Sequence, residues 1–142
     1  MTEETSARPC ACCGTEVAVL ACSGASNLGH LADLAARELS RRGSARMGCL
    51  AGIGAGAAGS INAVRNARRV VVIDGCPTQC GRRALERAGL TEFVSVRVDQ
   101  LGFKRGQSPV TQENVQRIAD EVCRILSEGP PSAGMKDSAC CE

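Results

Sequence analysis

Aromatic residues are almost absent from this sequence. Among its 142 residues there is no Trp or Tyr, and Phe93 and Phe103 are the only two Phe. Nucleic-acid bases therefore find no aromatic platforms on which to stack. The formal net charge is only +2, so nothing global indicates an affinity for nucleic acid or for an anionic membrane surface. We expect an aliphatic core and neither of these two partners.

Long apolar runs are also missing. The N-terminus, MTEETSARPC, is polar and has no apolar stretch of the kind found in signal peptides. No run approaches the roughly 20 apolar residues that a membrane-spanning helix needs. We therefore expect a soluble, cytoplasmic protein. Its length suits one domain whose core is large enough to fold without disulfides.

Cysteine, in contrast, is abundant, with ten residues in the chain. In a reducing cytosol this number indicates metal binding or thiol chemistry more than structural disulfides. One of them, Cys123, lies beside the apolar stripe of a predicted helix, and we expect it to pack in the core. The others have to be interpreted from where the fold places them.

Strand-like and helix-like patterns alternate along the chain. Apolar or β-branched runs predict strands at 16–22, 45–50, 69–74 and 93–98, and helical periodicity predicts helices between and after them. This alternation is typical of an α/β fold. We predict a single domain with a mostly parallel sheet of about four strands, helices on both faces, and a flavodoxin-like or Rossmann-like strand order.

The predicted domain spans residues 16–128. Shorter segments flank it at 1–15 and 129–142, and both are predicted to be flexible and contain cysteines. The small-residue run AGIGAGAAGS contains a G-x-G-x-x-G pattern, with Asp74 twenty residues after its first glycine. This matches the dinucleotide-binding pattern. The strand expected before it is weak, however, and we favour close backbone packing over nucleotide binding.

The predicted topology gathers four cysteines at one edge of the sheet. Cys22 ends the first strand, Cys49 ends the second, and Cys76 and Cys80 follow the third. Right-handed crossovers place the strand-to-helix loops at the same edge of a parallel sheet, which is where open α/β sheets bind ligands. We therefore predict a single site built from these four thiols.

The segment DGCPTQC adds local detail to this site. Pro77 suits the first position of a helix running to about Ala88, which would make Cys76 the N-cap and place Cys80 in the first turn. A helix N-terminus favours thiolate over thiol. The two cysteines can be metal ligands, or they can form a redox or sulfur-transfer pair in which Cys76 is the nucleophile and Cys80 the resolving thiol. Four thiols can also hold an iron–sulfur cluster.

Four separated motifs resemble the DGC-domain family: CSGASN (22–27), CLAGIG (49–54), DGCPTQC (74–80) and LGFKRGQSPVTQEN (101–114). The resemblance extends from about residue 17 to 126. The family is described as binding zinc through four cysteines, so the resemblance implies zinc as the cofactor. By position its ligands are Cys22, Cys49, Cys76 and Cys80, and we expect Asp74, Ser23 and Gly75 to lie next to them.

The remaining cysteines flank the domain. Neighbouring cysteines have Cα atoms about 3.8 Å apart, which is below the usual disulfide range, and thiolates suit soft ions such as Cu(I), Hg(II) or trivalent arsenic. We expect these residues to capture such an ion or to exchange it with a donor or acceptor protein; intermolecular disulfides, or no role, are the alternatives. Overall the sequence favours a metal-binding protein over an enzyme. The accessory thiols are Cys10, Cys12, Cys13, Cys140 and Cys141.

Overall fold

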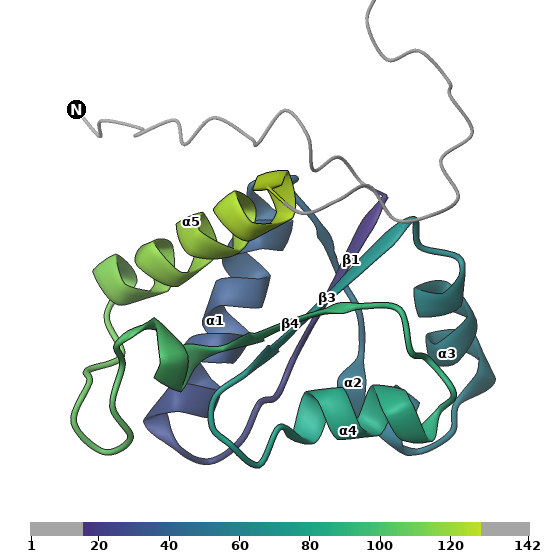
Figure 1. The fold of residues 1–142 in the computed structure, drawn as a ribbon, viewed down its shortest axis with the longest axis horizontal. Helices are drawn as coiled ribbons and strands as arrows, with labels where there is room; N and C mark the ends of the chain where they lie inside the picture. Colours follow the sequence, from purple (N-terminus) through teal and green to yellow (C-terminus); the bar gives the residue numbers. More distant parts are fainter. Residues whose placement is uncertain (1–15, 129–142) are drawn as a thin grey trace, which may run out of the picture.

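Four parallel strands form one sheet in the order β2-β1-β3-β4 (Figure 1). The computed structural model describes residues 16–128. The predicted α/β class and parallel sheet are confirmed, and the strand order matches the first four strands of the flavodoxin-like order. The strands are β1 (Val17–Ala21), β2 (Arg46–Met47), β3 (Arg69–Asp74) and β4 (Val94–Arg97).

The two central strands are buried on both faces. Strand β1 pairs with β3 from Val17 opposite Arg69 to Ala21 opposite Ile73. Their valine-rich sequences suit this environment, because β-branched side chains pack well on a pleated surface. Side chains alternate between the faces and so supply two separate clusters of buried residues, one under each helical layer.

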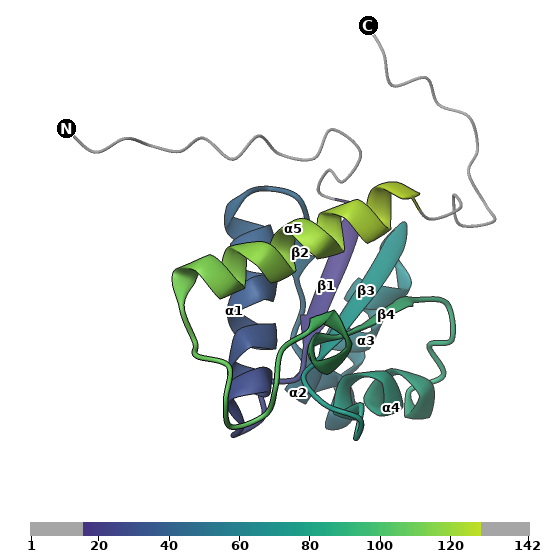
Figure 2. The same cartoon turned by 60° about the vertical axis from the view of Figure 1, so that its left-hand side comes forward.

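Helices cover both faces of the sheet (Figure 2). Residues of two helices join Val19 and Ile73 in one apolar cluster, while residues of the other three join Leu20 and Val72 in the second. The first layer consists of α1 (Asn27–Arg41) and α5 (Gln112–Glu128). The second consists of α2 (Leu50–Gly54), α3 (Ala58–Arg65) and α4 (Cys80–Arg87). A short 3-10 helix, η1 (Val98–Leu101), follows β4.

Helices α1 and α5 are joined by apolar and ionic contacts. Leu31 and Ile118 are fully buried between them. At the end of α1, the guanidinium of Arg42 donates to Glu38 at 3.0 Å and to Asp120 of α5 at 2.6 Å. Arg42 and Glu38 are largely withdrawn from solvent, whereas Asp120 is exposed, so the apolar contacts contribute most to how α5 packs on α1 and the ion pair adds a polar link at its end.

The second predicted strand is shorter than expected. Only Arg46 and Met47 pair with β1, although the N–H of Gly48 still donates to the carbonyl of Val19 at 2.9 Å. The chain then enters α2 at Leu50, so the prediction that Cys49 ends a strand was wrong. Its actual place is the N-cap of α2.

The G-x-G-x-x-G pattern does not form a dinucleotide-binding turn. Its first glycine, Gly54, is the last residue of α2, and its third, Gly59, lies in α3. Between them Gly56 has φ +74°, a conformation that glycine adopts readily. The pattern therefore links two short helices, whereas the nucleotide fingerprint links a strand to a helix. Among residues 16–128, no helix combines the length and apolar character needed to cross a membrane.

Candidate functional site

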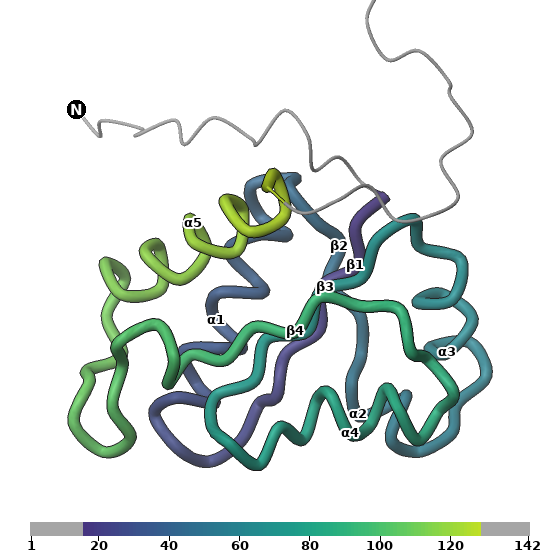
Figure 3. The backbone as a smooth tube through the Cα atoms, viewed as in Figure 1, coloured from purple at the N-terminus to yellow at the C-terminus, as the bar shows by residue number. Residues whose placement is uncertain are grey.

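Cys22 begins the loop that follows β1, at the carboxyl edge of the sheet (the lower edge in Figure 3). Its N–H donates to the carbonyl of Ile73 at 3.0 Å, which extends the pairing of β1 with β3 by one residue. Its Sγ accepts a hydrogen bond from the N–H of Gly75 at 3.1 Å. Burial raises the pKa of the Cys22 thiol, while the N–H groups of Gly75 and Gly24 partly oppose that rise.

Two glycines, Gly29 and Gly75, make this arrangement possible because only residues without a Cβ let these backbones touch. A Cβ on Gly75 would lie 2.7 Å from the backbone nitrogen of Gly29, and one on Gly29 would lie 2.7 Å from the carbonyl oxygen of Gly24. Real Cβ atoms do not approach other atoms so closely. The turn after β3, the first turn of α1 and the loop after β1 are therefore packed together at Gly24, Gly29 and Gly75.

Cys76 lies in the turn after β3 and is partly exposed. The hydroxyl of Thr78 donates a hydrogen bond to its sulfur, and the N–H of Thr78 donates a second. These bonds favour the charged form and, with the nearby positive charge of Arg105, lower the pKa of the Cys76 thiol. Cys22 is near enough for the two thiols to interact electrostatically.

The predicted helix start at Pro77 was wrong. Helix α4 begins at Cys80, and its N-cap is Gln79, which has φ 51° and ψ 51°. The physical reason is Asp74, whose buried carboxylate accepts the N–H groups of Gly81 at 2.7 Å and Arg82 at 3.0 Å. These first-turn N–H groups need an acceptor. A carboxylate from the end of β3 supplies it, so Cys76 is not the cap.

Cys49 and Cys80 both lie at helix starts. The Sγ of Cys49 caps α2 by accepting the N–H of Gly52 at 3.3 Å, a role that serine or asparagine usually fills. Cys80 is the first residue of α4, and both side chains are exposed. The structure thus places all four predicted ligands on loops or helix starts that follow β1, β2 and β3.

The four thiols share an edge without forming a closed ligand cluster. Within residues 16–128, no three His, Cys, Asp or Glu side chains are grouped so that they could hold a metal ion. The donor chemistry nevertheless fits a thiophilic ion, because N–H groups point at three of the sulfurs. Such bonds stabilise the thiolates that zinc and iron–sulfur clusters require.

The three residues expected beside the ligands have different roles. The N–H of Gly75 contacts Cys22 directly, and Asp74 caps α4. The hydroxyl of Ser23 instead donates to the side chain of Asp33, a residue of α1, at 2.9 Å. Cys123 is buried, as expected for a core residue. The accessory cysteines Cys10, Cys12, Cys13, Cys140 and Cys141 lie outside the described residues.

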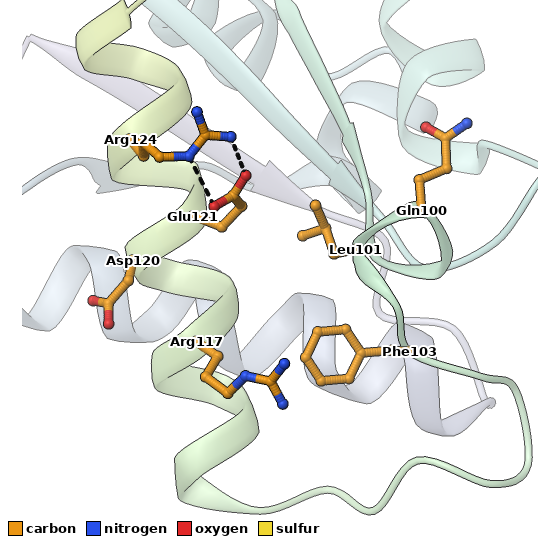
Figure 4. Close-up of a pocket in the computed structure, with 7 residues that line it drawn as sticks. All are labelled: Gln100, Leu101, Phe103, Arg117, Asp120, Glu121 and Arg124. Atoms are coloured by element: carbon orange, nitrogen blue, oxygen red, sulfur yellow. Dashed lines mark hydrogen bonds and ion pairs between the residues drawn. The ribbon is translucent and has the colours of Figure 1, made fainter.

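Three residues could not be identified from the sequence alone: Thr78 and Arg105, which act on the Cys76 thiol, and Asn27, which binds the loop that carries Arg105. All three lie inside the four motifs, but nothing in their spacing indicates an effect on sulfur or a contact with a distant loop. An open pocket of about 580 Å³ lies elsewhere, between η1 and α5 (Figure 4). There Arg117 lies over the ring of Phe103 at 5.1 Å from the ring centre. It contains no thiol, and it is lined by Gln100, Leu101, Phe103, Arg117, Asp120, Glu121 and Arg124.

Comparisons with known proteins agree with the motif resemblance. The family model described as DGC domain matches residues 18–122. The anaerobic and virulence modulator AnvM of Pseudomonas aeruginosa (strain PAO1) is 32% identical over 113 residues, which cover 78% of this chain and 86% of that protein. No solved structure matches the chain.

Proposed function

The chain belongs to the DGC-domain family, and from this premise we propose that it is a cytoplasmic metal-binding protein that holds zinc through four cysteine thiolates. The ligands would be Cys22, Cys49, Cys76 and Cys80. They come from three separate segments, so the ion would join the ends of β1 and β3 to the start of α2. A site of four thiolates leaves no open coordination position, which suits storage, transfer or sensing more than catalysis.

The observation that carries this proposal is the set of N–H groups directed at sulfur. Gly75 donates to Cys22 at 3.1 Å and Gly52 donates to Cys49 at 3.3 Å, and hydrogen bonding from Thr78 lowers the pKa of the Cys76 thiol. Of these three thiols only Cys22 is buried, and a buried thiol that only fills space does not need such a donor. Around a bound ion, hydrogen bonds of this kind orient the ligands and hold their charge.

The bound ion would supply positive charge that keeps the four sulfurs deprotonated. The chain's own residues prepare two of them in opposite ways. Cys76 is already biased toward thiolate by Thr78. Burial biases Cys22 toward the neutral thiol, so its proton has to leave when a metal binds. Metal uptake should therefore release protons and weaken as the pH falls.

The test is elemental analysis with a visible spectrum on protein purified without oxygen. We expect about one zinc per chain and no visible colour. Replacing Cys76 and Cys80 together by Ser should abolish the zinc, whereas the control Cys123→Ala removes a core thiol and should leave it in place. Protein without stoichiometric metal would overturn the proposal. A brown colour would show that the same thiols hold an iron–sulfur cluster instead of zinc.

Thiol chemistry at Cys76 is the second candidate, supported by its lowered pKa. A low pKa raises the fraction of nucleophilic thiolate at neutral pH. Cys80 is the predicted resolving thiol, and Cys22, whose thiol interacts electrostatically with Cys76, is a second candidate for that role. Oxidation of metal-free protein followed by peptide mapping distinguishes a Cys76–Cys80 disulfide from a Cys76–Cys22 disulfide. If neither forms reversibly, this alternative is removed.

The cysteines outside the described residues extend the same chemistry. We propose that Cys10, Cys12, Cys13, Cys140 and Cys141 capture a soft ion such as Cu(I), Hg(II) or trivalent arsenic, or exchange it with a partner protein. Serine at all five positions should then lower the capacity for such an ion and leave the zinc content unchanged. The relative's name describes an anaerobic modulator, and oxygen-sensitive thiolates would suit a comparable role here.

A further inference from the structure

One side chain, that of Asn27, holds a basic loop next to the thiol edge. Its Nδ2 donates to the carbonyls of Lys104 at 3.1 Å and Ser108 at 2.7 Å, and its Oδ1 accepts the N–H of Gly106 at 2.8 Å. These bonds use both ends of the amide and span nearly 80 positions of sequence. Asn27 is also the first residue of α1, only five positions after Cys22.

The loop is fixed by its own contacts as well. The N–H of Lys104 donates to the hydroxyl of Ser108 at 2.7 Å, and the N–H groups of Gln107 and Ser108 donate back to the carbonyl of Lys104. Before the loop, the buried Phe103 packs under the guanidinium of Arg117 (Figure 4). An exposed five-residue segment would ordinarily sample many conformations, so these contacts give it a defined position.

Two cations are exposed on this loop. Within residues 16–128, neither Lys104 nor Arg105 forms an ion pair with a carboxylate, whereas the cation nearest along the chain, Arg97, is paired with Asp99 at 2.6 Å. The Asn27 bonds place the loop against the first turn of α1, at the edge of the sheet where the thiols lie, and the charge of Arg105 is one of the causes that lower the pKa of the Cys76 thiol. The hydrogen bonds of Asn27 thus keep a positive charge without a carboxylate partner at the edge where the thiols would become negative.

We propose that the loop 104–108, positioned by Asn27, is a rim that selects small anions for the thiol edge. Under the proposed zinc function, on which this part rests, the metal would reach and leave the thiols as a complex with a small anionic ligand such as a thiolate or carboxylate chelator. Two cations on five residues suit a small anion better than the extended acidic surface of a protein partner, which needs many contacts.

The first experiment needs no metal. Reduced full-length protein is mixed with a dianionic aromatic disulfide, 5,5'-dithiobis(2-nitrobenzoate), or with neutral 2,2'-dithiodipyridine. The reaction is quenched at a series of times, and peptide mass spectrometry measures how much Cys76 remains unmodified. Both reagents meet the same thiolate, so a change in its pKa cancels in the ratio of their rates. We expect Arg105→Gln to lower the anionic-to-neutral ratio about threefold to tenfold, in the range of electrostatic effects on association.

Several variants make this test specific. Asn27→Ala should lower the ratio as Arg105→Gln does, because it releases the loop, and Arg105→Lys should largely keep it. Arg65→Gln is the matched control, since Arg65 is an exposed arginine at the end of α3, on the opposite edge of the sheet. Added salt should reduce the ratio in the natural protein and have little effect on Arg105→Gln. An unchanged ratio in Arg105→Gln overturns the proposal, even if Asn27→Ala fails to fold.

A second experiment connects the rim to the metal. Cobalt(II), whose absorption reports thiolate ligation, is offered as the aqua cation or as its anionic nitrilotriacetate complex. Arg105→Gln should slow uptake from the anionic complex more than uptake from the cation. If the disulfide assay shows charge selectivity but the protein takes up no cobalt, the proposed rim stands and the proposed metal function is overturned. Equal slowing from both cobalt sources would overturn the role of the rim in metal delivery.

Discussion

The N–H of Gly75 lies 3.1 Å from the sulfur of Cys22 and donates a hydrogen bond to it across 53 positions of sequence. The second residue of the Asp-Gly-Cys motif therefore holds the first thiol of the site, while the third residue supplies another. Because a side chain at position 75 would meet the backbone of Leu28 and Gly29, the bond depends on glycine. These contacts thus hold together the loop after β1, the turn after β3 and the first turn of α1 at the carboxyl edge of the sheet.

Gly75→Ala should destabilise the fold and disturb this edge. The three atoms nearest to the added Cβ are backbone atoms of Leu28 and Gly29, which are not easily displaced, so we expect the free energy of unfolding to fall by about 1–3 kcal/mol. Urea denaturation measures the change. Gly24→Ala is the control, because a Cβ there meets nothing within 4 Å. Equal losses from the two substitutions would contradict the packing argument.

Asp74→Ala should loosen the start of α4. The substitution leaves the N–H groups of Gly81 and Arg82 without their carboxylate acceptor, which we expect to lower the free energy of unfolding by about 2–3 kcal/mol. Hydrogen exchange of those two amides should accelerate. Asp33→Ala removes a partly exposed pair with Arg37 and the acceptor of the Ser23 hydroxyl, and it should cost about 1 kcal/mol or less. If α4 amides stay equally protected in Asp74→Ala, another group caps the helix.

Gln79→Gly should stabilise the protein. Gln79 is the only non-glycine residue among 16–128 with positive φ, a conformation that costs roughly 1–2 kcal/mol for residues with a Cβ. Part of the gain is offset by the greater freedom of glycine in the unfolded chain, so we expect a net increase of about 0.5–1 kcal/mol in thermal or urea unfolding. Gln79→Val should have the opposite effect. A loss of stability in Gln79→Gly would show that the Gln side chain makes a stronger contribution of its own.

The two neighbouring thiols should titrate in opposite directions from the ordinary value of 9.0. Hydrogen bonds from Thr78 lower the pKa of Cys76, so its alkylation in metal-free protein should reach half of its maximal rate below pH 9.0. Burial raises the pKa of Cys22, so its midpoint should lie above that value. Alkylation by iodoacetamide at a series of pH values, followed by peptide mass spectrometry, measures both.

Thr78→Val tests the cause of the Cys76 shift, because it removes the hydroxyl donor and should raise the midpoint. The pH dependence of the free energy of unfolding follows from the difference between the pKa of the thiol in the folded and unfolded states. A thiol whose pKa is lower in the folded state stabilises the fold most above its unfolded pKa, and this contribution is lost as the pH falls through the folded pKa. An unchanged midpoint in Thr78→Val would show that the Thr78 hydroxyl does not act on the sulfur.

Patterns of apolar residues predicted the sheet well, because burial on both faces leaves a continuous valine-rich run such as the one in β3. Those patterns also located Cys22, Cys49 and Cys76 after successive parallel strands. The start of α4 was mispredicted because Pro77 and Cys76 fit a local capping rule, while the true acceptor, Asp74, acts from the end of a strand. Local rules do not include such an acceptor.

Asn27 shows a second limit of prediction from sequence. Its amide bonds backbone carbonyls at Lys104 and Ser108, and carbonyl groups carry no residue identity that a sequence pattern could reveal. The motif containing Lys104 was visible, but its position against α1 depends on tertiary packing. For the same reason the sequence could place thiols along one edge of the sheet, while the distances between their sulfur atoms follow only from loop conformation.

Helix α5 is the last element among residues 16–128, yet it packs across α1 and completes the apolar layer on that side of the sheet. Because domains generally fold as units during synthesis, a nascent chain has released Cys22, Cys49, Cys76 and Cys80 from the ribosome before the helix that completes their scaffold exists. The order of elements along the chain therefore separates the synthesis of the four thiols from the completion of the apolar layer that supports them.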